Sequence, residues 1–170
     1  EGDIEDAILR FQPELAECLY DLMLFYRELK AEARQFIEDK ARFSKSDFSQ
    51  LMARNQRYSN AVKEVIELGK SIGDAFAWFF YRDNLPELGK HFQHESTGLF
   101  VSGIGGRGEI EFIMQQQNMY GFFALYHGIT TMLRVGDFSL YEFGNGIVGI
   151  GEIKTRKNES CEKRIDIEAY

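Results

Sequence analysis

Apolar residues in the first half of the chain recur at alternating spacings of three and four, with charged residues between them. This rhythm is typical of a helix that packs along a single seam, as in a coiled coil. Pro13 precedes the pattern, and we expect it in the first helical turn, where its missing N–H has no helical partner to lose. The predicted seam of this first helix consists of Leu15, Leu19, Leu22, Tyr26, Leu29, Ala33 and Phe36.

A second helix with the same rhythm follows a polar break at 41–47. Ser46 is its predicted N-cap, because a serine hydroxyl accepts a hydrogen bond from the free amides of a first turn. So short a break favours an antiparallel hairpin, and we predict a coiled-coil-like helical arm over residues 1–83. The predicted seam of the second helix consists of Phe48, Leu51, Asn55, Tyr58, Val62, Val65, Gly69, Ile72, Phe76 and Phe79.

Glycine becomes frequent from residue 84 onward, which predicts a second part, residues 84–170, built from shorter elements and turns. Segment 97–103 is predicted as a short strand or an extended loop. Segment 103–120 is predicted as a glycine-rich entry to a helix. The β-branched and aromatic residues of 122–135 predict a strand that is long and bent.

A β-hairpin is the most specific structural signal in the chain. Residues 137–143 alternate between apolar and polar, Gly-Asn-Gly at 144–146 is a strong hairpin turn, and 147–155 is predicted as the returning strand. Antiparallel pairing about this turn places positions 137 and 152 nearly opposite each other, at the same end of the ribbon.

Charged side chains gather at that end. Asp137 opens the first strand, and Glu152 and Lys154 share one face of the second, because alternate residues of a strand point the same way. Two carboxylates at close range repel each other, and one of them becomes neutral unless a cation intervenes. A divalent metal ion fits this place, since Mg²⁺ is commonly held by one or two carboxylates and retained waters.

The predicted metal site consists of Asp137, Glu152 and the backbone carbonyl of Ile153, which together hold Mg²⁺ or Mn²⁺. Lys154 is predicted to orient or deprotonate a metal-bound water, or to stabilise charge on a phosphate. This set suits the hydrolysis of a phosphodiester. The same residues on a solvated strand would form an ordinary ion pair worth under about 1 kcal/mol, which is the structural alternative.

The order Gly-Asp-Phe, hairpin, Gly-Glu-Ile-Lys-Thr resembles the PD-(D/E)xK nuclease superfamily. The resemblance spans residues 103–157 and implies that Asp137, Glu152 and Lys154 are the catalytic trio. It also implies an acidic residue on the helix before the sheet, for which we choose Glu109 over the neighbouring acid at 111.

The resemblance implies a restriction-endonuclease-like helix and β-sheet core. With the long antiparallel helical hairpin that the periodicity predicts before it, the expected fold is of the α+β or α/β class. Gly136 stands where the family has a proline. The family core continues after the lysine-bearing strand into a further helix and strand, whereas only residues 156–170 remain here. We therefore expect a core that is truncated at its C-terminal end.

Composition narrows the function further. The chain has 170 residues and a formal net charge of −7, which argues against a general polyanion binder. A bound metal and the basic positions within 156–164 nevertheless favour nucleic acid, and DNA in particular, as partner. Cys18 and Cys161 give no disulfide framework, so a reducing, cytoplasmic setting is expected. No apolar run is long enough to cross a bilayer, and no membrane partner is predicted.

The leading prediction is thus a magnesium-dependent nuclease that acts on DNA, with a hairpin suited to homodimerisation or to docking of a protein partner. The alternative is a non-catalytic interaction module, in which a degenerate nuclease fold and the hairpin bind a protein. His91 and His94 share a helical face like half of a zinc site, but no further ligands lie near in sequence and we expect them on the surface. His127 is expected as a hydrogen-bonded histidine of the core or rim.

Overall fold

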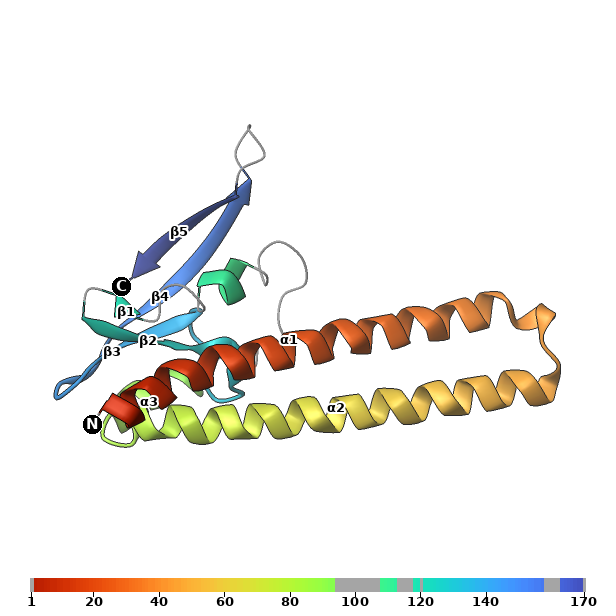
Figure 1. Cartoon of the computed structure of the whole chain (residues 1–170), viewed down its shortest axis with the longest axis horizontal. Coiled ribbons are helices and arrows are strands. Elements are labelled where there is room, and N and C mark those ends of the chain that lie inside the picture. Colours follow the sequence, from red (N-terminus) through yellow and green to blue (C-terminus); the bar gives the residue numbers. More distant parts are fainter. Residues whose placement is uncertain (1, 94–107, 113–117, 120, 158–162, 170) are drawn as a thin grey trace.

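Two long helices form an antiparallel hairpin, as the sequence predicts. Helices α1 (Gly2–Glu38) and α2 (Lys45–Tyr81) have 37 residues each and are joined by the 3₁₀-helix η1 (Lys40–Arg42). They lie side by side, and their connecting end projects away from the rest of the molecule (Figure 1). The computed structural model describes residues 2–93, 108–112, 118–119, 121–157 and 163–169.

An antiparallel sheet lies against the end of the hairpin that holds the N-terminus (Figure 1). Helix α3 (Leu85–His91) follows the hairpin, and the 3₁₀-helix η2 (His127–Ile129) lies between two strands. Each strand pairs with the next one in the chain, which confirms the α+β class. The strands are β1 (Asn118–Met119), β2 (Phe122–Tyr126), β3 (Phe138–Glu142), β4 (Gly146–Lys157) and β5 (Lys163–Ala169).

The predicted hairpin between β3 and β4 is confirmed. Its turn is closed by the Asn145 N–H, which donates to the Glu142 carbonyl at 3.1 Å. Phe138 pairs with Gly151, so the residue before Phe138 and the residue after Gly151 lie at the same end of the ribbon. These two residues are Asp137 and Glu152, the acids of the predicted metal site. After β4 the chain returns as β5, antiparallel to β4.

The long strand predicted over 122–135 is wrong beyond Tyr126. The chain turns into η2 and then runs without regular structure to β3. The Thr130 hydroxyl accepts from the Leu133 N–H at 3.1 Å, and Asp74 of α2 accepts from the two amides that follow Thr130, at 2.7 and 3.0 Å. These side chains supply the hydrogen bonds that a neighbouring strand would otherwise provide, and so they favour a loop.

Pro13 lies inside α1 and not in its first turn, so the predicted start of this helix is wrong. An interior proline removes one helical hydrogen bond and costs about 3 kcal/mol. The helix continues through it because the preceding turns are packed on the sheet. Ile8 and Leu9 pack against the core, and the Gln12 side chain bonds to two backbone groups of β2 at 2.8 and 2.7 Å.

The N-cap of α2 is Ser44, two residues before the predicted Ser46. The Ser44 hydroxyl oxygen accepts from the Asp47 N–H at 3.1 Å, and the hydroxyl lies 2.8 Å from the Asp47 carboxylate. The arrangement resembles a capping box, in which the side chains of the N-cap and of the third helical residue support the same turn.

The buried seam of α2 differs from the predicted one, because four of the ten predicted positions are exposed. The predicted Tyr58, Val65, Ile72 and Phe79 are 45–56% exposed. Close approach decides the difference: a Cβ on Gly73 would lie 1.9 Å from the backbone oxygen of Ile129, so only glycine fits there. The buried residues of α2 are Asn55, Ser59, Val62, Ile66, Lys70, Gly73, Ala77, Phe80 and Tyr81.

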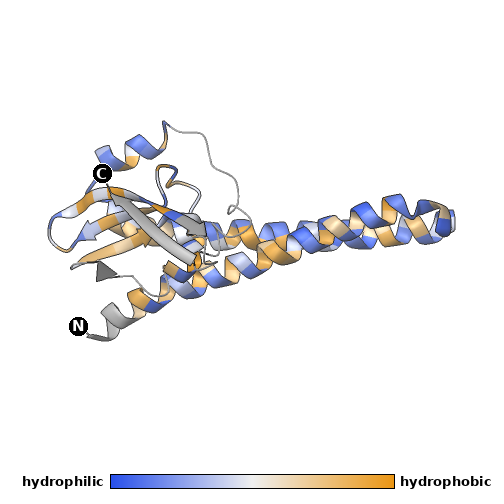
Figure 2. Cartoon of the chain, turned by 90° about the horizontal axis from the view of Figure 1, so that it is seen from above, coloured by the Kyte–Doolittle hydropathy of each residue, from blue (hydrophilic) through white to orange (hydrophobic). Residues whose placement is uncertain are grey.

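The hairpin and the sheet are packed together by two hydrophobic clusters, each of which contains residues of the helices and of the strands. The Phe80 ring of α2 stacks on Phe123 of β2, with centroids 5.0 Å apart. Hydrophobic residues line the strands and also recur along both helices well beyond the sheet (Figure 2). Within the part of the chain that the structure describes, no helix is long and apolar enough to span a membrane.

The predictions for the histidines and for segments 97–103 and 103–120 have mixed outcomes. His91 is fully buried, which corrects the expected surface position, while His94 and segment 97–103 lie outside the described residues. Of the helix predicted within 103–120, residues 108–112 are helical in the described part. His127 is buried and hydrogen-bonded, as expected.

Candidate functional site

Asp137 is held at the start of β3 by hydrogen bonds on two sides. Its N–H donates to the Gly151 carbonyl at 2.8 Å, and its own carbonyl accepts from the His127 N–H at 2.9 Å. Its side-chain Oδ2 accepts from the Ile153 N–H at 2.7 Å. The carboxylate therefore takes the next place in the ladder between β3 and β4, and β4 itself sets its position.

Gly136 makes this close approach possible. Its φ is +67°, a conformation that glycine adopts without strain. A Cβ there would lie 2.7 Å from the Gly151 carbonyl oxygen and 2.6 Å from a methyl group of Ile150. A proline, which the resembling family carries at this position, requires a φ near −65° and does not fit this backbone.

Glu152 and Lys154 lie on one face of β4, as the alternation predicts. The Lys154 Nζ is 3.7 Å from the Glu152 carboxylate, and the two side chains are 38% and 41% exposed. Ile153 between them is buried. A contact this long and this exposed contributes little to stability, so packing of Ile153 and the strand pairing hold this segment.

Glu109 comes from the helical stretch 108–112 and is the fourth predicted site residue. Its carboxylate accepts a hydrogen bond from the Tyr126 hydroxyl at 2.7 Å. Burial raises the pKa of Glu109, the Tyr126 hydroxyl opposes this rise, and the charge of Asp137 adds to it. Glu109 and Asp137 are therefore close enough for their charges to interact.

The Asp137 carboxylate interacts electrostatically with Glu152 of β4 and with Glu109 of the stretch 108–112. Burial raises the pKa of Asp137, the hydrogen bond from the Ile153 amide opposes the rise, and the charge of Glu152 adds to it. Together with Glu109, these residues form a set of coupled carboxylates from three parts of the chain. A cation among them would relieve the repulsion.

The backbone adds a further oxygen to this set. In an extended strand, the N–H and C=O of one residue point to the same side. The carbonyl of Ile153 therefore points to the side on which its N–H binds Asp137. Two carboxylates and a carbonyl are an all-oxygen donor set of the kind that Mg²⁺ and Mn²⁺ accept.

These donors do not form a closed cage. Among the described residues, no group of three or more His, Cys, Asp or Glu side chains is placed to hold a metal ion. Mg²⁺ commonly keeps several waters and takes only one or two carboxylates from the protein. The donor set fits an open site of that kind, in which water or substrate completes the coordination.

A chain of buried hydrogen bonds lies behind Asp137, and the sequence did not reveal it. The Nδ1 atom of His91 accepts from the Arg134 and Val135 amides at 3.0 and 3.1 Å, so the proton of the neutral ring is on Nε2. This Nε2 lies 3.0 Å from the Tyr81 hydroxyl, which is 2.6 Å from the hydroxyl of Ser139.

The chain then reaches the segment that precedes Asp137. The Ser139 hydroxyl lies 2.6 Å from Nε2 of His127, and Nδ1 of His127 lies 3.1 Å from the Gly136 carbonyl. Burial, followed by the neighbouring His91, lowers the pKa of His127 to about 3, so this ring is neutral near pH 7. Burial raises the pKa of Tyr81 to about 12.

Donors and acceptors in this network allow one consistent order. Each group donates to the next, from His91 through Tyr81 and Ser139 to His127, and the last N–H donates to the Gly136 carbonyl. Both ends of the network bind residues 134–136, directly before Asp137. The sequence signal that pointed to it was weak: a serine in β3 and a histidine directly after β2, both among apolar residues.

Comparison with known proteins yields no relative. No protein-family model matches the chain, and neither a curated protein nor a solved structure shows a significant match. The similarity to PD-(D/E)xK nucleases therefore rests on the sequence motif, and membership of that superfamily stays a prediction.

Proposed function

We propose that this chain is a metal-dependent nuclease domain that hydrolyses phosphodiester bonds in DNA. The observation that carries the proposal is the coupling of Glu109, Asp137 and Glu152 at one end of the β3–β4 ribbon, with Lys154 beside Glu152. Buried carboxyl groups with a raised pKa and a nearby amine are more common at functional sites than elsewhere.

Each residue has a definite role in this proposal. Asp137, Glu152 and the Ile153 carbonyl would hold Mg²⁺ or Mn²⁺. Such an ion, when bound, lowers the pKa of water and neutralises charge on a phosphate. Lys154 would orient the attacking water or stabilise the charge that develops on the phosphate. Glu109 is a further carboxylate that would help to orient that water.

A basic face of α1 supports a polyanionic substrate. Arg27, Lys30 and Arg34 follow one another at spacings of three and four, so they share a helix face, and they line one shallow hollow. Lys30 lies about five turns beyond Gln12, which bonds to β2, so both point to the same side of the helix. A phosphate backbone bound on the sheet side of the hairpin would meet these cations.

Metal titration, followed by thermal unfolding, tests the site. We expect Mg²⁺ or Mn²⁺ to raise the Tm of the parent protein, because a ligand that binds only the folded state stabilises it. Asp137→Asn and Glu152→Gln should lose this gain. Glu64→Gln, an exposed substitution on α2, should keep it. A metal response that survives both site substitutions would reject the site.

Plasmid cleavage tests the activity itself. With Mn²⁺, the parent protein should cut DNA, and Lys154→Ala should cut about 100-fold more slowly, as expected for loss of a group that stabilises developing charge. Cutting by Lys154→Ala at the full rate would reject the role of the lysine. The alternative function, a non-catalytic module that binds a protein partner, predicts neither metal stabilisation nor cleavage.

A further inference from the structure

A second apolar stripe on α2 lies open to solvent beside the buried seam. Its spacing alternates between three and four over three heptads, which is the pattern of a coiled-coil seam. The large side chains of the stripe are 45–62% exposed. The stripe consists of Tyr58, Ala61, Val65, Leu68, Ile72, Ala75 and Phe79, all of them exposed.

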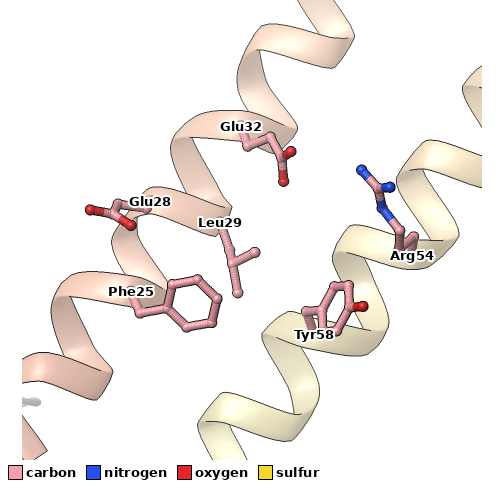
Figure 3. Close-up of a pocket in the computed structure, with 6 residues that line it drawn as sticks. All are labelled: Phe25, Glu28, Leu29, Glu32, Arg54 and Tyr58. Atoms are coloured by element: carbon pink, nitrogen blue, oxygen red, sulfur yellow. The ribbon is translucent and has the colours of Figure 1, made fainter.

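This stripe lies on the side of α2 that is turned away from the sheet. Asp74, which bonds to the Thr131 amide on the sheet side at 2.7 Å, follows Ile72 by two residues, about 200° around the helix. On the open side α1 contributes Phe25, which is 46% exposed. Figure 3 shows Phe25 and Tyr58 on either side of a groove between the helices, with a volume of about 450 Å³.

The size of this surface suits a dimer. Six large apolar side chains, the five of the stripe and Phe25, retain about half of their area, or roughly 600 Å² in total for residues of this size. Two such surfaces face to face would bury roughly 1,200 Å², the lower end of the range for specific interfaces. A contiguous apolar patch of roughly 600 Å² is at the upper limit for a monomer.

The charges beside the stripe favour a second copy of this chain as the occupant. Glu28 and Arg54 line the same groove, in which Arg54 lies across from Glu32, one turn along α1 from Glu28 (Figure 3). Arg57 lies one turn further along α2, which runs antiparallel to α1, and so is about level with Glu28. A two-fold axis parallel to the helices places α1 of one copy over α2 of the other. Glu28 of each copy then meets Arg57 of the other, so the surface is complementary to itself.

We propose that the α2 stripe and Phe25 form the interface of a homodimer, in which two hairpins pack as a four-helix bundle. In this dimer the large side chains of both stripes are buried, and the groove between Phe25 and Tyr58 of each copy receives a side chain of the other copy. This inference depends on the hairpin alone, so it stands or falls independently of the nuclease proposal.

Analytical ultracentrifugation of the full chain across the micromolar range tests the dimer. We expect a concentration-dependent dimer for the parent protein. Val65→Glu and Ile72→Glu place a carboxylate in the centre of both stripes and should each raise the dimer dissociation constant at least about tenfold. The control is Gln56→Glu, an exposed residue about 180° around α2 from Val65, which should leave the dissociation constant unchanged.

The same measurement can overturn the proposal. Both glutamate variants change side chains that are exposed in a single copy, so their circular dichroism at low concentration should match that of the parent. A parent protein that stays monomeric throughout would refute the dimer, even if some other protein binds the stripe. A dimer that survives both substitutions would place the interface elsewhere.

A charge swap tests the orientation of the two copies. Arg57→Glu should weaken the dimer, because it sets a carboxylate against Glu28 of the other copy. Adding Glu28→Arg to the same chain should restore the parental dissociation constant. Failure of the double variant to restore it would refute the parallel two-fold arrangement.

Discussion

The distal half of the hairpin, residues 24–65, and the strand region, residues 121–154, bury their apolar residues in different ways. In the distal half, each helix has one other helix to pack against, so one seam is buried and the next stripe remains open. In the strand region both faces of the sheet are covered. Phe123 of β2 packs on Phe80 of α2, and Phe138 of β3 packs on Phe112 of the stretch 108–112.

Polar side chains follow the same division. Ser139 and His127 are buried in the strand region, where they lie 2.6 Å from each other, and Ser139 also contacts the hydroxyl of Tyr81 of α2. In the distal half, Ser59 is also buried, but its hydroxyl has no hydrogen-bond partner among the residues that the structure describes. The comparison indicates that the strand region is specified by a connected polar network in addition to packing. The distal half is specified mainly by packing along one seam, across which the Asn55 side chain donates to the Leu29 carbonyl and to the Glu32 carboxylate at 2.9 and 2.8 Å.

The largest expected difference between the regions comes from aromatic truncation. Phe138→Ala removes a fully buried ring and should lower the free energy of unfolding by about 3–5 kcal/mol. Ile37→Ala, at a residue of α1 that is 58% exposed, should change it by less than about 0.5 kcal/mol. Urea unfolding followed by circular dichroism measures both. Similar losses from the two substitutions would contradict the difference in burial.

Replacing a buried serine by alanine should change the free energy of unfolding in opposite directions in the two regions. Ser139→Ala leaves the Tyr81 O–H without its acceptor and Nε2 of His127 without its donor, and should destabilise the protein by about 1–3 kcal/mol. Ser59→Ala removes a buried hydroxyl that has no partner and adds the better helix former, so it should stabilise by about 0.5–1 kcal/mol. Chemical unfolding of the two variants beside the parent decides this, and a loss of stability in Ser59→Ala would contradict it.

The smallest expected effect is a pH dependence confined to the site. The pKa of Asp137 is raised above 3.8 in the folded protein, so the folded state holds this proton more tightly than the unfolded state. The stabilisation that the protonated Asp137 gives the folded state is fully present below pH 3.8, and it is lost as the pH rises through the pKa of Asp137 in the folded protein. Asp137→Asn still offers an oxygen to the Ile153 amide but carries no charge.

In a chelator-containing buffer, Asp137→Asn should therefore gain stability relative to the parent as the pH rises from below 4 toward neutrality. Urea midpoints for the two proteins at several pH values measure this. A difference that stays constant with pH would show that Asp137 has no raised pKa. Addition of Mn²⁺ near neutral pH should reverse the order, if the ion binds as proposed.

The sequence by itself determined the elements that depend on local chemistry. The three-and-four rhythm specified two helices, and the Gly-Asn-Gly turn specified the β3–β4 hairpin. A bulge between Leu140 and Tyr141 shifts the register by one residue and places Asp137 level with Glu152. These predictions succeeded because helix periodicity, strand alternation and turn preference act between residues only a few positions apart. Such short-range rules also put Glu152 and Lys154 on one strand face.

Only the tertiary structure decided which of two equivalent stripes of α2 is buried, because both have the same spacing and the choice depends on where Gly73 can approach Ile129. It also decided that α1 runs through Pro13, where contacts of the earlier turns with the sheet outweigh the lost hydrogen bond. The network from His91 to Gly136 was invisible in the sequence for the same reason. Its members are far apart in the chain, and their hydrogen bonds exist only after α2, α3 and β3 have packed together.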